Sequence, residues 1–137
     1  MKPRHIHRGE DCRAVSDILQ RVGDKWTVLV VGKLGEGQMR FNELRTAVGG
    51  ISQKMLTTTL RGLERDGFVT RTVFPTIPPR VDYALTELGN EVLRVFEAWE
   101  DFSQRHWTHV LASRQRFDES IGEEPQPAEP ALKRASR

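Results

Sequence analysis

At 137 residues, the chain is long enough to bury one hydrophobic core but too short for several domains of average size. Its longest strongly apolar run, residues 26–31, is far too short to span a bilayer, so we expect no membrane partner. A single cysteine excludes a disulfide framework within the chain. The basic N-terminus has no apolar stretch behind it, which predicts no secretory signal and a cytoplasmic protein.

The net charge of +2 hides an uneven distribution along the chain. Residues 1–80 carry 14 Lys/Arg against 8 Asp/Glu, a balance of +6, whereas residues 81–137 carry 7 against 11, a balance of −4. A positive N-terminal part attracts a polyanion such as nucleic acid. Taken alone, the same asymmetry is equally typical of a solvated surface with no such partner.

The N-terminal part reads as an arm followed by two helices. Residues 1–10 are polar and basic, which predicts a mobile arm. A first helix is expected from Asp11, its cap, to Gly23, with Val15, Ile18, Leu19 and Val22 facing inward. A second is expected from Asp24 or Lys25 to Leu34, ended by a turn at Gly35 and Gly37. The expected domain spans residues 11–118.

Two short helices are expected next, after a short strand at residues 39–41. Residues 42–48 form the first, Gly49-Gly50 makes the turn, and Ser52 caps the second. In the second helix, Leu56, Leu60 and Leu63 share one face, with Met55 beside them. The opposite face has hydroxyls, an amide and cations but no carboxylate, which suits phosphates and base edges in a major groove. Its residues are Gln53, Lys54, Thr57, Thr58 and Arg61.

Two alternating apolar runs follow, at residues 69–74 and 81–85, separated by the Pro-rich segment Pro75–Arg80. This pattern predicts a β-hairpin with an extended loop. A helix followed by a hairpin with a basic tip is typical of a winged helix. The expected fold is therefore mainly α with a small β-hairpin (α+β), a winged helix-turn-helix with dimerisation helices at both ends.

A long final helix is expected from Thr86, its cap, with apolar residues three or four apart. It carries more aromatic side chains than a small domain needs, and exposing each one costs roughly 1.5–3 kcal/mol. The helix either folds back on its own domain or, as we prefer, packs with the first helix in a two-fold dimer. Beyond residue 119 the composition predicts a disordered tail, 119–137. The expected interface residues are Val15, Leu19, Val92, Phe96, Trp99, Phe102 and Trp107.

Four blocks in order, residues 23–27, 40–45, 50–57 and 78–89, closely resemble the HxlR-type winged-helix transcriptional regulators, relatives of the MarR group. The resemblance covers about residues 12–102. It implies a bacterial homodimer that binds a pseudo-palindromic operator as repressor or activator, and that lies on the nucleoid when bound. The helix from Ser52 would enter the major groove, with the wing Pro75–Arg80 alongside.

Chemistry and resemblance agree on the expected DNA contacts. Ser52, Gln53 and Lys54 lie at a helix N-terminus, where backbone N–H groups favour phosphate. Gln53 suits an adenine edge, Thr57 and Thr58 suit a thymine methyl or a phosphate, and Arg61 suits either base or backbone. Three further cations, Arg40, Arg71 and Arg80, are expected as phosphate clamps, with Arg80 at the minor groove. Thr59, Arg65 and Arg45 are expected to be ordinary solvated surface.

Cys12 lies at the position where members of this family often carry a cysteine. In some members, that cysteine senses oxidants or electrophiles. The family's usual Cys-Pro pair is broken here by Arg13. The neighbouring charges oppose one another in their effect on the thiol, so a redox-sensing role and a structural role both stay open.

Other sites find little support in the sequence. His5, His7 and Cys12, or His106 and His109, are better explained as solvated or packed side chains than as metal ligands. No catalytic set or phosphate loop is evident, so we expect no enzyme, no metal and no cofactor. Two alternatives keep the fold: a regulator whose small effector binds near Phe96, Trp99 and the partner chain, and a protein-interaction module without DNA.

Overall fold

The computed structural model describes residues 9–123, which divide into a compact unit ending at Ala98 and a second unit beginning at Trp99. Residues 1–8 of the expected arm (1–10) and residues 124–137 of the expected tail (119–137) lie outside the described residues, whereas residues 9 and 10 of the arm are helical. None of the helices within 9–123 is both long and apolar enough to cross a membrane. The elements are α1 (Gly9–Val22), α2 (Lys25–Leu34), β1 (Met39–Arg40), α3 (Phe41–Val48), α4 (Gln53–Arg65), β2 (Val69–Phe74), β3 (Arg80–Leu85) and α5 (Glu87–Glu123).

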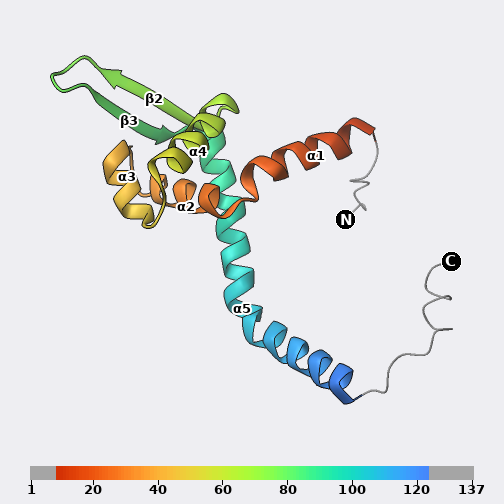
Figure 1. The fold of residues 1–137 in the computed structure, drawn as a ribbon. Coiled ribbons are helices and arrows are strands. Elements are labelled where there is room, and N and C mark those ends of the chain that lie inside the picture. The colour runs from red at the N-terminus through yellow and green to blue at the C-terminus, as the bar shows by residue number, and fades with distance from the viewer. Residues whose placement is uncertain (1–8, 124–137) are drawn as a thin grey trace. The chain divides into compact units, whose positions relative to one another are not determined.

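Helices α2, α3 and α4 enclose the core of the first unit (Figure 1). Capping residues set where two of these helices begin. Asp24 accepts a hydrogen bond from the backbone N–H of Trp26, and Ser52 Oγ accepts one from Met55, both at 3.0 Å. Gly49 and Gly50 make the turn before α4 with φ of 73° and 74°, values that residues with side chains rarely adopt. The buried core comprises Val30, Val31, Leu34, Leu44, Ile51, Leu56, Leu60, Leu63, Phe68, Val69 and Tyr83.

Strands β2 and β3 form the expected antiparallel hairpin, which extends outward from the helices (Figure 1). Strand β1 adds a third strand beside β3, so the sheet order is β1-β3-β2. Val69 pairs with Leu85 and Arg71 with Tyr83, which puts these four side chains on one face of the hairpin. This register fixes the side of the hairpin that meets α4. The mainly helical winged helix-turn-helix predicted from the sequence is confirmed.

Helix α1 begins at Gly9, so Asp11 lies inside the helix and the expectation that it caps the helix is wrong. Only its C-terminal end joins the core, through Val22. The expectation that Val15, Ile18 and Leu19 face inward is also wrong for a single chain, because these three residues are 49%, 53% and 61% exposed, respectively. These three side chains therefore lie on the surface of this unit.

The start of α5 closes the first unit. Thr86 Oγ1 accepts a hydrogen bond from the N–H of Gly89 and donates one to the carbonyl of Gly67, which joins this helix start to the turn after α4. Val92 and Phe96, expected at a dimer interface, are half-buried against the core of their own chain.

The second unit contains the remainder of α5, from Trp99 to Glu123. Trp99, Phe102 and Trp107 are 66%, 46% and 51% exposed, and the Trp99 and Phe102 rings stack at 5.6 Å. The helix continues to Glu123, so residues 119–123 are helical, whereas the sequence predicted a tail from residue 119.

Candidate nucleic-acid interface

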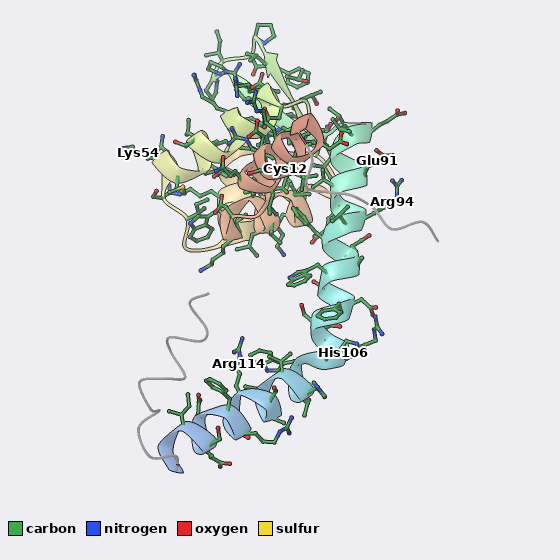
Figure 2. All side chains as sticks on the ribbon, turned by 90° about the vertical axis from the view of Figure 1, so that its right-hand side faces the viewer. Cys12, Lys54, Glu91, Arg94, His106 and Arg114 are labelled. Atoms are coloured by element: carbon green, nitrogen blue, oxygen red, sulfur yellow. The ribbon has the colours of Figure 1, made fainter. Side chains whose placement is uncertain are left out.

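The outward face of α4 carries the polar residues predicted from the sequence. Leu56, Leu60 and Leu63 anchor the opposite face in the core, which fixes the rotation of the helix. Figure 2 shows Lys54 at the outer edge of the first unit. The exposed residues at the cap and along this face are Ser52, Gln53, Lys54, Thr57, Thr58 and Arg61. The face therefore offers hydroxyl, amide and cationic groups to an acceptor-rich surface.

Two residues of α4 differ from expectation. Met55, expected beside the apolar face, is 42% exposed and lies next to the polar one. Thr59, expected to be solvated, is only 6% exposed. Thr59 is three residues after Leu56 and four before Leu63, so helical spacing does place it on the buried face. Because threonine is polar, the apolar spacing read from the sequence did not include it.

A hollow between α4 and the hairpin brings four of the predicted residues together. Gln53, Thr57 and Arg61 line it from the helix, with Glu64 and Arg65 towards the end of α4, and Arg71 lines it from β2. Phe41, Val81 and Tyr83 supply its apolar floor. Arg71 reaches this place because it pairs with Tyr83 on the face of the hairpin that meets the helix. This hollow thus combines polar side chains of α4 with a cation of β2.

Arg40 and Arg45 lie at the two ends of α3, Arg40 at its N-cap and Arg45 in its last turn. Arg40 is exposed at the end of β1, and its backbone N–H donates to Glu43 Oε1 at 2.9 Å, which fixes the start of α3. Arg45 Nε donates to the carbonyl of Ile51 at 3.2 Å across the Gly49-Gly50 turn. Arg45 is thus more than the solvated surface expected from the sequence: it ties α3 to the residue just before the Ser52 cap.

Arg80 is placed differently from the other predicted cations. Its guanidinium carbon lies 4.2 Å from the centroid of the Phe74 ring, and its Nε lies 3.3 Å from Asp82 Oδ1. Arg80 Nε and Asp82 Oδ1 are both buried, and neither atom makes a hydrogen bond within the described residues. Asp82 itself is 8% exposed. Arg80 is therefore held by Phe74 and Asp82 at the outer end of the strands, where the Pro-rich loop joins them.

Cys12 lies in α1 and is exposed (Figure 2). No cluster of three or more His, Cys, Asp or Glu side chains that suits a metal ion occurs in residues 9–123. His5 and His7, considered with Cys12 as an alternative metal site, fall outside that range.

Known proteins share this arrangement. The family model described as HxlR-like helix-turn-helix matches residues 21–111. The HTH-type transcriptional regulator YtfH of Escherichia coli (strain K12) is 42% identical over 98 residues, which cover 72% of this chain and 78% of that one.

Solved structures agree with the sequence relatives. The transcriptional regulator ytfH from Salmonella typhimurium is similar with a TM-score of 0.66 and 40% identity, covering 74% of this chain and 90% of that one. The redox regulator HypR in its reduced form is similar with a TM-score of 0.65 and 36% identity, covering 73% and 98%. The chain belongs to the HxlR-like helix-turn-helix family and is a transcriptional regulator with a DNA-binding fold.

Proposed function

We propose that this regulator acts as a homodimer that binds a pseudo-palindromic operator, with α4 in the major groove and the β2–β3 hairpin alongside. The observation that carries the proposal is the N-terminal half of the outward face of α4, where six exposed polar or cationic residues lie together; Glu64, the carboxylate that lines the same hollow, lies towards the other end of the helix. A carboxylate among these six residues would repel phosphate and compete for base donors. The face thus has the composition that groove recognition requires.

Each residue has a role that follows from its place. Lys54 lies in the first turn of α4, where the free N–H groups and helix dipole also attract phosphate. Ser52 is the cap, so its hydroxyl is partly committed to Met55. Gln53 and Arg61 have the reach and donors for base edges. Further contacts, to phosphate or to a thymine methyl, are assigned to Thr57, Thr58, Arg40 and Arg71. Arg80 is left out because it is held by Phe74 and Asp82.

The homodimer is supported by apolar surface that one chain leaves uncovered. In α1, Val15 and Leu19 are half-exposed or more, and the same is true of Trp99 and Trp107 in the second unit. Burying such side chains yields roughly 1.5–3 kcal/mol each. A two-fold dimer would bury both copies of each apolar patch. It would also present two copies of α4 related by two-fold symmetry, and this symmetry matches a pseudo-palindromic site.

Selection of bound fragments from genomic DNA tests the proposal, because it returns both the recognition sequence and its symmetry. The expected result is one motif with two inverted half-sites. Affinity for that motif should then fall steeply with salt, with a log–log slope of about −0.9 for each phosphate contacted. A shallow slope, or equal binding to random duplex, would instead favour a protein-interaction module.

We further propose that Cys12 makes the regulator responsive to oxidants. The thiol is exposed, and HypR, a relative of known structure, is described as a redox regulator in reduced and oxidised forms. With the thiol oxidant diamide, Cys12 of one protomer and Cys12 of its partner would form a disulfide. The two thiols release two protons and two electrons, and diamide takes up both to become the hydrazine.

The test compares the parent protein with Cys12→Ser, before and after diamide treatment. Operator affinity of the parent should change, and a covalent dimer should appear on a non-reducing gel. Cys12→Ser should show neither effect. A diamide response that survives in Cys12→Ser would exclude the thiol mechanism, and the signal would then be sought in a small effector bound without a covalent bond.

A further inference from the structure

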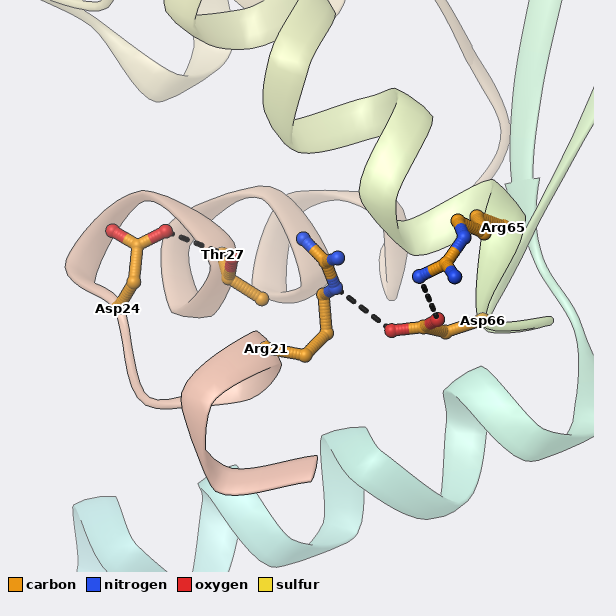
Figure 3. Close-up of polar contacts among 5 residues, drawn as sticks. All are labelled: Arg21, Asp24, Thr27, Arg65 and Asp66. Carbon is orange, nitrogen blue, oxygen red and sulfur yellow. Dashed lines mark hydrogen bonds and ion pairs between the residues drawn. The ribbon is translucent and has the colours of Figure 1, made fainter. Parts of the chain in front are cut away.

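An ion pair joins the end of α1 to the end of α4. Arg21 lies in the last turn of α1, and its Nε donates to Asp66 Oδ2 at 2.7 Å (Figure 3). Asp66 is the residue at which α4 ends. The two residues are 45 positions apart in sequence, and their side chains are 32% and 30% exposed. Partial burial reduces solvent screening, so this contact restrains the two helices more than a surface pair does.

Gly62 gives the Arg21 guanidinium the space to lie against α4. Gly62 is fully covered within the helix, and a Cβ atom added there would collide with Nη1 and Cζ of Arg21. A glycine inside a helix is unfavourable relative to alanine because its backbone is freer in the unfolded chain. The guanidinium of Arg21 therefore occupies the space that a side chain at position 62 would take. We name Arg21, Gly62 and Asp66 the latch.

The negative charge of Asp66 is compensated by nearby cations. The carboxylate lies at the C-terminal end of α4, where the helix dipole is negative and disfavours it. Arg21 and, at 3.9 Å, Arg65 compensate that charge. Arg65 is 81% exposed, so the cation held against the helix is Arg21.

The latch acts on the helix that carries the proposed DNA contacts. The core leucines of α4 fix its rotation, and Arg21 holds its far end against α1. A helix of 13 residues is stiff, so a shift at Asp66 moves the polar face at its other end. We propose that Arg21 is a positioning residue, which sets the direction of α4 and thereby the preference for the operator over random DNA. This inference rests on the proposed function of α4.

A matched pair of variants separates positioning from charge. Arg21→Gln removes the cation of the latch. Arg13→Gln removes the same charge from the same helix at an exposed position that has no ion pair in the described part of the chain. Affinities for the selected operator and for a random duplex of equal length are measured below the unfolding temperature of every variant.

Arg21→Gln should lower the operator-to-random affinity ratio roughly tenfold relative to Arg13→Gln, the size expected for a coupled contact. Gly62→Ala displaces the guanidinium without changing charge and should lower the ratio similarly. Asp66→Asn combined with Arg21→Gln should cost little more than either change alone. A lowered melting temperature with an unchanged ratio in both Arg21→Gln and Gly62→Ala would reduce the latch to a stabilising contact and overturn the proposal. If the parent protein itself shows no operator preference, it is the proposed function that fails.

Discussion

Arg80 lies across the ring of Phe74, with its guanidinium carbon 4.2 Å from the ring centroid. The two residues face each other in the register of β2 and β3, at the base of the Pro-rich loop. Asp82, two residues along the same strand, holds the other side of the cation. The positive charge of Arg80 is therefore held by contacts within the hairpin, whereas the sequence alone assigns it to DNA.

This placement predicts different roles for the two arginines of the hairpin. Arg71→Ala should make the salt dependence of operator binding shallower by about 1.8, because a dimer loses two phosphate contacts at about 0.9 each. Arg80→Ala should leave that slope unchanged and lower the free energy of unfolding by about 1 kcal/mol through lost stacking. Fluorescence anisotropy titrations at several salt concentrations measure the slopes. An equal loss of slope in both variants would mean that Arg80 leaves Asp82 to contact phosphate.

The reading face of α4 is tested by Lys54→Ala and Arg61→Ala. Lys54→Ala should weaken operator and random duplex alike, because a phosphate contact carries no sequence information. Arg61→Ala should cost about 1–3 kcal/mol at the operator if the guanidinium contacts a base. Arg94→Ala, an exposed cation on α5, is the control for loss of one positive charge. Normal operator binding by both α4 variants would rule out this face as the interface.

Adjacent residues of α4 should differ sharply in their effect on stability. Leu56 is fully buried, so Leu56→Ala should lower the free energy of unfolding by about 2–5 kcal/mol. Met55 is 42% exposed, and Met55→Ala should change it by less than about 1 kcal/mol. Urea denaturation followed by circular dichroism measures both values. Similar losses for the two variants would contradict the orientation of the helix.

Local patterns were enough to predict much of the fold. The Ser52 cap, the Gly49-Gly50 turn and the hairpin depend on residues within a few positions of one another, and each was found where the sequence predicted it. Thr59 shows the limit of such patterns, because its polarity hid its place between Leu56 and Leu63.

Contacts between distant segments were not predictable in this way. Arg21 and Asp66 are separated by 45 positions, and nothing near either residue indicates the other. Arg80 and Asp82 are close in sequence, but the stacking of Arg80 on Phe74 depends on the strand register, which pairs these two residues. The same holds for Arg71, whose place beside Thr57 and Arg61 follows from its partner Tyr83.

The exposed aromatic residues after Ala98 predict that charged substitutions in this part of α5 dissociate the dimer. On a helical projection at 100° per residue, Trp99, Val110, Phe117 and Ile121 fall on one stripe of α5, and Phe102 and Trp107 lie at its two borders. Phe102→Glu and Trp107→Glu should each raise the dissociation constant of the dimer at least about a hundredfold, since each variant changes two side chains worth roughly 1.5–3 kcal/mol. Light scattering after size exclusion measures the mass across a dilution series.

Gln104→Glu is the matched control, because it adds the same charge to the same helix at an exposed position away from the stripe. It should remain a dimer at micromolar concentration, as should the parent protein. The monomeric variants should also bind the full operator much more weakly while keeping their affinity for one half-site, because linking two reading helices is what makes the second contact intramolecular. A parent protein that is monomeric at micromolar concentration would remove the basis for a two-fold operator, and α4 would then have to read a single half-site.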